Sequence, residues 1–227
     1  IRYDAPYSTG QWLRDVTPHL AGRERPIIVG GTGLNFQALT HGLADIPATD
    51  PTLRTHGNTL SIHDLLAELD PETLSRIDTR NRMRVQRAWE VLQQTGRPLA
   101  DWQDATPPAL LPPHDATRIT LDVPTDWLNA RIAKRFQIML DSGGLNEARA
   151  MLPHWNPAHQ SAKAIGAPAL IAHLRGDIAL DAACDSAITA SRQYAKRQRT
   201  WFRSKHKDWD HFDISSTDLS TGLAFLR

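Results

Sequence analysis

Residues 51–111 of this chain carry helical patterns and no strand pattern. Proline-rich breaks lie at both ends of this block, at Ile46–Pro51 (IPATDP) and at Thr106–Pro108 (TPP). Proline lacks a backbone N–H and disfavours helix in the residue before it, so these breaks separate the block from its neighbours. The pattern predicts an all-helical segment at residues 50–111.

Strand patterns lie on both sides of this block. Pro26–Val29 is a short apolar run, and Arg118–Val123 alternates between polar and apolar residues. The other predicted elements are a helix from Tyr7–Ser8 through Val16, a helix near Leu34, a helix that ends at Ser142–Gly144, more helices to about Ser204, and a strand near His211–Ile214. The sequence therefore predicts an α/β core at residues 1–49 and 112–227, interrupted by a helical insert at residues 50–111.

A glycine turn, Gly30–Gly33, follows the first strand pattern. Glycines between a strand and a helix let backbone N–H groups approach a phosphate, and Thr32 adds a hydroxyl near the helix N-terminus. No lysine follows, so the turn is not the usual nucleotide-binding loop. Many such turns use glycine only to permit a positive φ angle. By residue type alone, both a phosphate site and a tight turn stay open.

The net charge of +1 indicates no partner, but the distribution of charge does. Arg192–Lys207 contains seven Lys or Arg and no acid, and Arg76–Arg87 contains five arginines and one acid, Asp78. At helical spacing these form two basic stripes, one of Arg76, Arg80, Arg84 and Arg87 and the other of Arg192, Lys196, Arg199 and Arg203. Solvated helix faces usually mix both signs of charge, so two stripes without acids favour a phosphate backbone over plain solvated surface.

The sequence also excludes several classes of function. The ten histidines and Cys184 show no metal-ligand spacing, so no metal-binding residues are predicted. No apolar run is long enough to cross a bilayer, and no membrane partner is expected. A single cysteine forms no internal disulfide and fits a reducing cytoplasm. Trp201, inside the second basic segment, is the one tryptophan considered functional.

Several separated segments resemble one enzyme family, in the same order along the chain. They are Tyr7–Ser8, Val29–Leu34 (VGGTGL), Gly42–Pro47 (GLADIP), Asp50–Arg54 (DPTLR), Arg84–Val91 (RVQRAWEV), Ala164–Gly166 (AIG) and Arg192–Arg203 (RQYAKRQRTWFR). The last segment is the most specific, because Arg-Gln-x-Ala-Lys-Arg-Gln-x-Thr-Trp is hard to obtain by chance. On these segments the chain resembles the tRNA dimethylallyltransferases (tRNA isopentenyltransferases).

The resemblance implies a reaction, a fold and partners. Members of that family transfer a dimethylallyl group from its diphosphate to N6 of the adenosine 3′ to the anticodon, with Mg²⁺. They have a P-loop NTPase-like parallel-sheet core and a helical insert that grips the tRNA anticodon arm. The chain is then expected to be a cytoplasmic, monomeric and predominantly helical prenyltransferase whose partners are tRNA and dimethylallyl diphosphate.

The resemblance also implies roles for individual residues. Thr32 and Arg54 are the expected catalytic residues, with Thr32 at the diphosphate and Arg54 where the family has a tRNA-contacting arginine. The expected diphosphate-binding residues are Gly30, Gly31, Thr32, Gly33 and Arg192. The expected tRNA-binding residues are Arg54, Met83, Arg84, Val85, Gln86, Arg87, Lys163, Gly166, Lys196, Arg197, Gln198, Arg199, Thr200, Trp201 and Arg203.

The chain departs from the family pattern at two points. It contains neither the Gly-x-x-x-x-Gly-Lys-Thr/Ser loop nor the Asp-Ser-x-Gln segment with the expected base, and both would precede Ile1. The core is therefore expected to be incomplete at its N-terminus and the chain as given to be inactive. Ala167–Ala169 also stands where the family usually has Tyr, a basic residue and Glu or Gln. Two other functions stay open, an adenylate-type isopentenyltransferase acting on free nucleotides and a non-catalytic RNA-binding fragment, although the basic stripes and the long insert favour tRNA.

Overall fold

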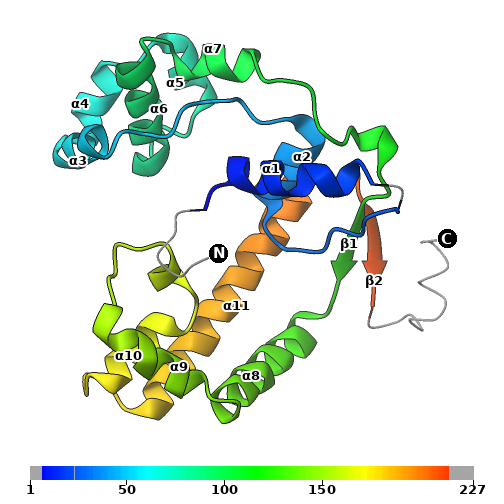
Figure 1. Cartoon of the computed structure of the whole chain (residues 1–227), viewed down its shortest axis with the longest axis vertical. Coiled ribbons are helices and arrows are strands. Elements are labelled where there is room, and N and C mark those ends of the chain that lie inside the picture. Colours follow the sequence, from blue (N-terminus) through cyan, green and yellow to red (C-terminus); the bar gives the residue numbers. More distant parts are fainter. Residues whose placement is uncertain (1–6, 23, 215–227) are drawn as a thin grey trace. The chain divides into compact units, whose positions relative to one another are not determined.

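The computed structural model describes residues 7–22 and 24–214 (Figure 1). Contacts within the chain divide it into two compact units, which we call the core unit and the helical unit. Among the described residues, the core unit comprises residues 7–11, 24–34 and 116–214, and the helical unit comprises residues 12–22 and 35–115. Helices α1 (Thr9–Leu20) and α2 (Gly33–His41) each begin in a range of the core unit and continue into a range of the helical unit.

Short helices with side-chain caps build most of the helical unit. They are α3 (Pro51–Thr59), α4 (Ile62–Ala67), α5 (Pro71–Arg76), α6 (Arg82–Thr95) and α7 (Leu99–Asp104), followed by a 3-10 turn at Pro113–Asp115. Asp50 accepts two hydrogen bonds from the first turn of α3, at 2.7 and 3.1 Å, and Ser61 and Asp64 form a reciprocal capping box at α4. No strand lies within residues 51–111, all of which are described, so the helices predicted there are confirmed.

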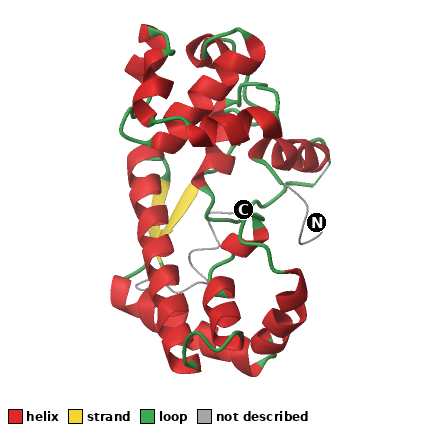
Figure 2. Ribbon diagram, turned by 90° about the vertical axis from the view of Figure 1, so that its left-hand side faces the viewer, coloured by secondary structure: helices red, strands yellow, loops and turns green. Residues whose placement is uncertain are grey.

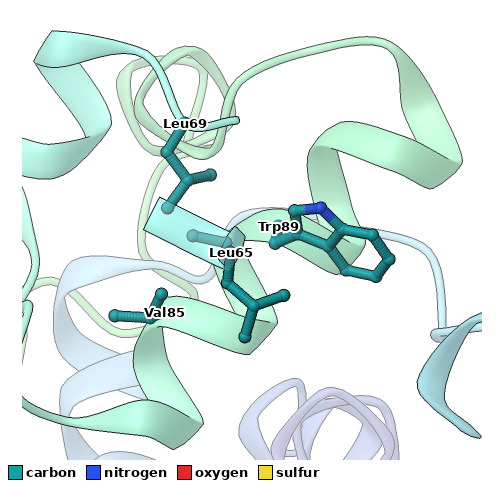
Figure 3. Packing of buried hydrophobic residues seen from close by; sticks show 5 residues of the cluster. Leu65, Leu69, Val85 and Trp89 are labelled. Atoms are coloured by element: carbon teal, nitrogen blue, oxygen red, sulfur yellow. The ribbon is translucent and has the colours of Figure 1, made fainter. Parts of the chain in front are cut away.

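The hydrophobic core of the helical unit is centred on α4 and α6 (Figure 3). Leu65, Leu69, Val85, Ala88 and Trp89 pack together there, each with at most 8% of its surface exposed. The apolar residues of α6 recur at helical spacing, which turns one face of that helix inward. Burial stabilises the fold by roughly 1.5–3 kcal/mol for each large side chain, so α6 is the central element of this unit.

The core unit combines a small parallel sheet with longer helices (Figure 2). Strands β1 (Ile119–Asp122) and β2 (Asp210–Asp213) pair in parallel, with Ile119 opposite Asp210. The helices are α8 (Thr125–Asp141), α9 (Gly144–Met151), α10 (Ala167–Leu174) and α11 (Leu180–Lys205), with 3-10 turns at Leu152–His154 and Ser161–Lys163. In the described part of the chain, no helix is long and apolar enough to cross a membrane.

Most elements predicted for the core are confirmed. These are the helices from Tyr7–Ser8 and near Leu34, the strands at Arg118–Val123 and near His211–Ile214, and the helix that ends at Ser142–Gly144. The strand predicted at Pro26–Val29 is wrong, because the segment is a loop in which Ile27 and Val29 are 72% and 86% exposed. A strand forms only when a neighbour takes its backbone N–H and C=O groups, and the described sheet contains only β1 and β2.

The basic stripe predicted over Arg76–Arg87 is also wrong as a single helix face. Helix α5 ends at Arg76 and α6 begins at Arg82, so these arginines do not share one helix axis. The break arises because Ile77 adopts an extended conformation, with φ −108° and ψ 155°, and Asn81 then caps α6.

Candidate functional site

The glycine turn Gly30–Gly33 lies in the core unit and leads into α2. The side-chain amide of Gln198, on α11, donates a hydrogen bond to the carbonyl of Gly31 at 3.0 Å. Thr32 is exposed, and its side chain forms no hydrogen bond with any residue that the structure describes. The turn is therefore held by α11 while the Thr32 hydroxyl is available to a ligand.

Gly31 and Gly33 allow two side chains of α11 to approach the turn closely. A Cβ atom on Gly31 would lie 2.1 Å from the amide nitrogen of Gln198, and one on Gly33 would lie 2.0 Å from Cδ1 of Trp201. Neither glycine has a positive φ angle, so the explanation of these glycines by a left-handed turn is wrong. They are required by tertiary packing instead.

The steric role of Gly33 is testable through stability. We expect Gly33→Ala to destabilise the protein by about 1–3 kcal/mol, because the methyl group overlaps the rigid indole of Trp201. Gly31→Ala should cost less, because the Gln198 side chain can rotate away. Urea unfolding measures both variants, with Gly22→Ala as control, where the nearest atom to a Cβ would be 3.6 Å away. Equal stability of all three variants would contradict this account.

Helix α11 presents a second face that is basic. Its stripe consists of Arg192, Lys196, Arg199 and Arg203, at spacings that place them on one side of the helix, away from Gln198 and Trp201. All but Arg199 are exposed, and Arg199 donates to the hydroxyl of Thr125 at 3.1 Å. Within residues 7–22 and 24–214, no carboxylate forms an ion pair with any of the four. The second predicted stripe is therefore confirmed as one basic helix face.

Two other residues of α11 that are predicted to bind tRNA, Arg197 and Thr200, contact neighbours on the same helix. Arg197 lies over the ring of Tyr194, 5.7 Å from its centroid, and the Thr200 hydroxyl donates to the carbonyl of Lys196 at 3.1 Å. Arg192, predicted for the diphosphate, lies on the basic stripe, and no hydrogen bond joins it to a described residue of the glycine turn. Its role at the diphosphate stays a prediction.

In the helical unit, Arg54 and Arg87 lie around one buried carboxylate, that of Glu90. Arg54 donates to Oε2 of Glu90 at 3.0 Å, and the two side chains are 55% and 2% exposed. The Thr49 hydroxyl donates to the same oxygen at 3.0 Å and accepts hydrogen bonds from Arg54 and Arg87. Arg87 also donates to the Pro47 carbonyl at 3.3 Å. Burial lowers the pKa of Arg87, and the negative charge of Glu90 opposes that shift.

The start of α6 is predicted to contact tRNA, and some of its side chains are exposed while others are buried. Met83 is 74% exposed and Arg84 is exposed, whereas Val85 and Gln86 are only 0% and 7% exposed. A hollow of about 400 Å³ adjoins this segment, lined by Arg76, Ile77, Met83, Arg84, Arg87, Leu99 and Gln103. Met83 and Arg84 are thus accessible to a partner, and the side chains of Val85 and Gln86 serve the interior.

Arg76, on the wall of this hollow, is paired with two carboxylates. It lies 2.7 Å from Glu72 and 2.6 Å from Asp104. The hydrogen bonds that Arg76 donates to Asp104 and Glu72 raise the pKa of Arg76, and Arg76 lowers the pKa of Asp104. Arg76 therefore links α5 to α7 and does not add free positive charge to the surface.

A second hollow, of about 170 Å³, lies in the core unit beside Lys163 and Gly166. Lys163 is exposed, whereas Gly166 is buried with φ 96°. A Cβ on Gly166 would lie 2.9 Å from the ring of Phe136, so packing and backbone conformation both favour glycine there. Pro168 and Ala169, from the segment that departs from the family pattern, form part of the wall.

Comparison with known proteins identifies the family. The family described as IPP transferase matches residues 1–205, a range that includes the glycine turn, the start of α6 and the basic stripe of α11. The chain belongs to this family.

Relatives in the IPP transferase family agree in sequence and fold. A tRNA dimethylallyltransferase of Ruegeria sp. (strain TM1040) is 59% identical over 209 residues, which cover 92% of this chain and 73% of the relative. The full-length tRNA isopentenylpyrophosphate transferase of Bacillus halodurans is 30% identical, with a TM-score of 0.64 over 100% of this chain and 73% of that one. A eukaryotic dimethylallyltransferase acting on tRNA has a TM-score of 0.76 over 97% of this chain and 59% of its own, and at 20% identity it supports the fold alone.

The family resemblance implies Mg²⁺. The described residues contain no group of three or more His, Cys, Asp or Glu side chains that could hold a metal ion. We therefore assign no residue to Mg²⁺ and derive no step through it.

The sequence interpretation assigned no role to Glu90. The residue lies inside the quoted segment Arg84–Val91, four residues after Gln86 and three after Arg87. That spacing places an acid beside both side chains on one helix, which is the only local signal of its role.

Proposed function

We propose that this protein transfers a dimethylallyl group from dimethylallyl diphosphate to N6 of the adenosine on the 3′ side of the anticodon. One observation supports this most directly: α11 holds the glycine turn through Gln198 and Trp201 and carries the basic stripe on its other face. A single helix thus connects the glycine turn to a surface suited to an RNA backbone. The tRNA dimethylallyltransferase at 59% identity supports the same assignment.

In the proposed reaction the adenine amine bonds to the allylic carbon while the bond to the diphosphate oxygen breaks. Negative charge then increases on the departing diphosphate. The free hydroxyl of Thr32 and the backbone N–H groups of Gly30–Gly33 are the proposed donors to that charge, with Arg192 as a further cation. The amine loses a proton to a general base, which is not assigned among these residues.

Each unit carries residues that we propose to contact tRNA. In the core unit they are the basic stripe of α11 with Lys163, and in the helical unit they are Arg54, Met83 and Arg84. We propose residues 50–111 as the insert that grips the anticodon arm, and residues 1–49 and 112–227 as a P-loop NTPase-like catalytic core. An enzyme acting on free nucleotides needs no basic surface of this extent, which disfavours the adenylate-type alternative.

The proposal also covers the activity of the 227 residues alone, the cellular location and the oligomeric state. The 227 residues contain no Gly-x-x-x-x-Gly-Lys loop and no Asp-Ser-x-Gln segment. We therefore propose that this chain by itself binds tRNA without transferring the dimethylallyl group. We also propose that the protein acts in the cytoplasm, where its substrate tRNA is found, and that it acts as a monomer.

The basic stripe gives a direct test of tRNA binding. We expect the double variant Lys196→Ala/Arg203→Ala to weaken binding of an anticodon stem–loop RNA. The slope of log K against log salt should fall by roughly one unit for each lost phosphate contact. Fluorescence anisotropy across a salt series measures both quantities. Arg149→Ala/Arg175→Ala removes the same charge from other exposed positions and should change the slope less. Identical slopes for the two double variants would reduce the stripe to solvated surface.

A further inference from the structure

We infer that Glu90 is a positioning residue, whose buried carboxylate holds the Arg54 guanidinium at the surface of the helical unit in an orientation that can bind one RNA phosphate. The phosphate partner rests on the proposed function. The positioning itself rests only on contacts within the helical unit.

Glu90 has a buried carboxylate, and both of its oxygens accept hydrogen bonds. Only 1% of the residue is exposed. Its Oε2 atom accepts from Arg54 and from Thr49, each at 3.0 Å, and its Oε1 atom accepts from the Gln86 amide at 3.1 Å. Removing a carboxylate from water is costly unless it is paired and hydrogen-bonded, and these three donors meet that requirement.

Arg54 is fixed at two places and free at a third. Its backbone carbonyl accepts from the Gln86 amide at 3.4 Å, and its Nη2 atom donates to Glu90 and to Thr49. Its Nε and Nη1 atoms donate to no residue that the structure describes, and the side chain is 55% exposed. A guanidinium anchored through one nitrogen keeps its other donors for a partner, and planar bidentate donors suit a phosphate.

The net charge of the cluster formed by Arg54, Arg87 and Glu90 also favours a phosphate partner. Arg54 and Arg87 contribute two positive charges and Glu90 one negative charge, so one positive charge remains unmatched. Arg87 is occupied by Thr49 and Pro47, which leaves Arg54 as the exposed cation. A phosphodiester carries one negative charge and would balance the cluster. Stability alone explains the arrangement poorly, because a buried ion pair is often no more stabilising than apolar residues of similar size.

Replacing Glu90 distinguishes a positioning role from a purely electrostatic role, because the two roles predict opposite changes in RNA affinity. Glu90→Gln keeps the shape of the side chain but makes the protein more positive by one charge. If Glu90 acted only through its charge, the variant would bind RNA more tightly. If Glu90 positions Arg54, the variant should bind the anticodon stem–loop about tenfold more weakly despite its added positive charge. In an Arg54→Ala background the same substitution should cause no further weakening.

Two other variants make the test specific. Glu68→Gln removes the same charge from an exposed carboxylate that binds Trp89 and Gln93, and it should not weaken RNA binding. Thr49→Val removes the hydroxyl that is hydrogen-bonded to Glu90, Arg54 and Arg87, without changing the charge of the protein. Like Glu90→Gln, it should weaken RNA binding. It also serves as the test if circular dichroism shows that Glu90→Gln is unfolded.

A measurement without RNA tests the positioning independently. NMR of ¹⁵N-labelled arginine should show slowed exchange of the Arg54 guanidinium protons in the wild-type chain, and Glu90→Gln should abolish that protection. Protection that persists in Glu90→Gln would overturn the positioning role. Lost protection with unchanged RNA affinity would overturn its functional part. If the wild-type chain bound no stem–loop at all, the proposed function would fail, and the NMR comparison would still decide whether Glu90 orients Arg54.

Discussion

Thr32→Ala is expected to lower kcat for dimethylallyl transfer by about 10²-fold, while changing the KM for tRNA little. The Thr32 side chain makes no hydrogen bond to a described residue, and it lies at a turn that Gln198 and Trp201 hold in place. A hydroxyl that donates to the leaving diphosphate, as we propose for Thr32, acts mainly as charge develops there. Its loss should therefore raise the barrier of the chemical step rather than weaken ground-state binding of RNA.

Steady-state kinetics in a form of the protein that transfers the group would measure this effect. Thr32→Ser retains a hydroxyl at the same position and should recover most of the lost rate. Because Thr32 is exposed, neither substitution should change the unfolding free energy by more than a few tenths of a kcal/mol. An increase in the KM for tRNA with unchanged kcat would instead place Thr32 in the RNA-binding surface.

The second large effect concerns the 227-residue chain alone, which should bind the anticodon arm in a salt-sensitive manner yet transfer no dimethylallyl group. The basic stripe of α11 and the exposed side of Arg54 lie within the chain. The glycine turn supplies N–H groups and one hydroxyl, but neither a fixed lysine nor an assigned base accompanies it. The diphosphate would then depart with much of its charge unbalanced, and the amine would keep its proton.

An assay with radiolabelled dimethylallyl diphosphate and an anticodon stem–loop decides this prediction, with RNA binding measured in parallel. A protein that carries the same 227 residues together with a Gly-x-x-x-x-Gly-Lys loop and an Asp-Ser-x-Gln segment is the positive control. Sustained turnover by the 227 residues alone would show that Gly30–Gly33 and its neighbours form a complete site. Absence of salt-sensitive binding would instead contradict the RNA surface.

The sequence by itself determined what depends on near neighbours along the chain. Helices without strands at residues 51–111 followed from periodicity and from caps such as Asp50 and Ser61, which act over three or four residues. The basic face of α11 followed from the spacing of its cations, which is again a local property. The segment Arg192–Arg203 was specific enough to indicate the family, which the comparisons confirm.

Only the tertiary structure decided which side chains contact or pair with residues distant in the sequence. Gln198 and Trp201 lie against the glycine turn, Arg76 pairs with a carboxylate 28 residues away, and Glu90 meets Arg54 from 36 residues away. The apolar run at Pro26–Val29 reads as a strand, yet it is a loop, because a strand requires a paired neighbour. Burial, charge pairing and strand pairing depend on groups that are distant in sequence and meet only on folding, so local patterns do not fix them.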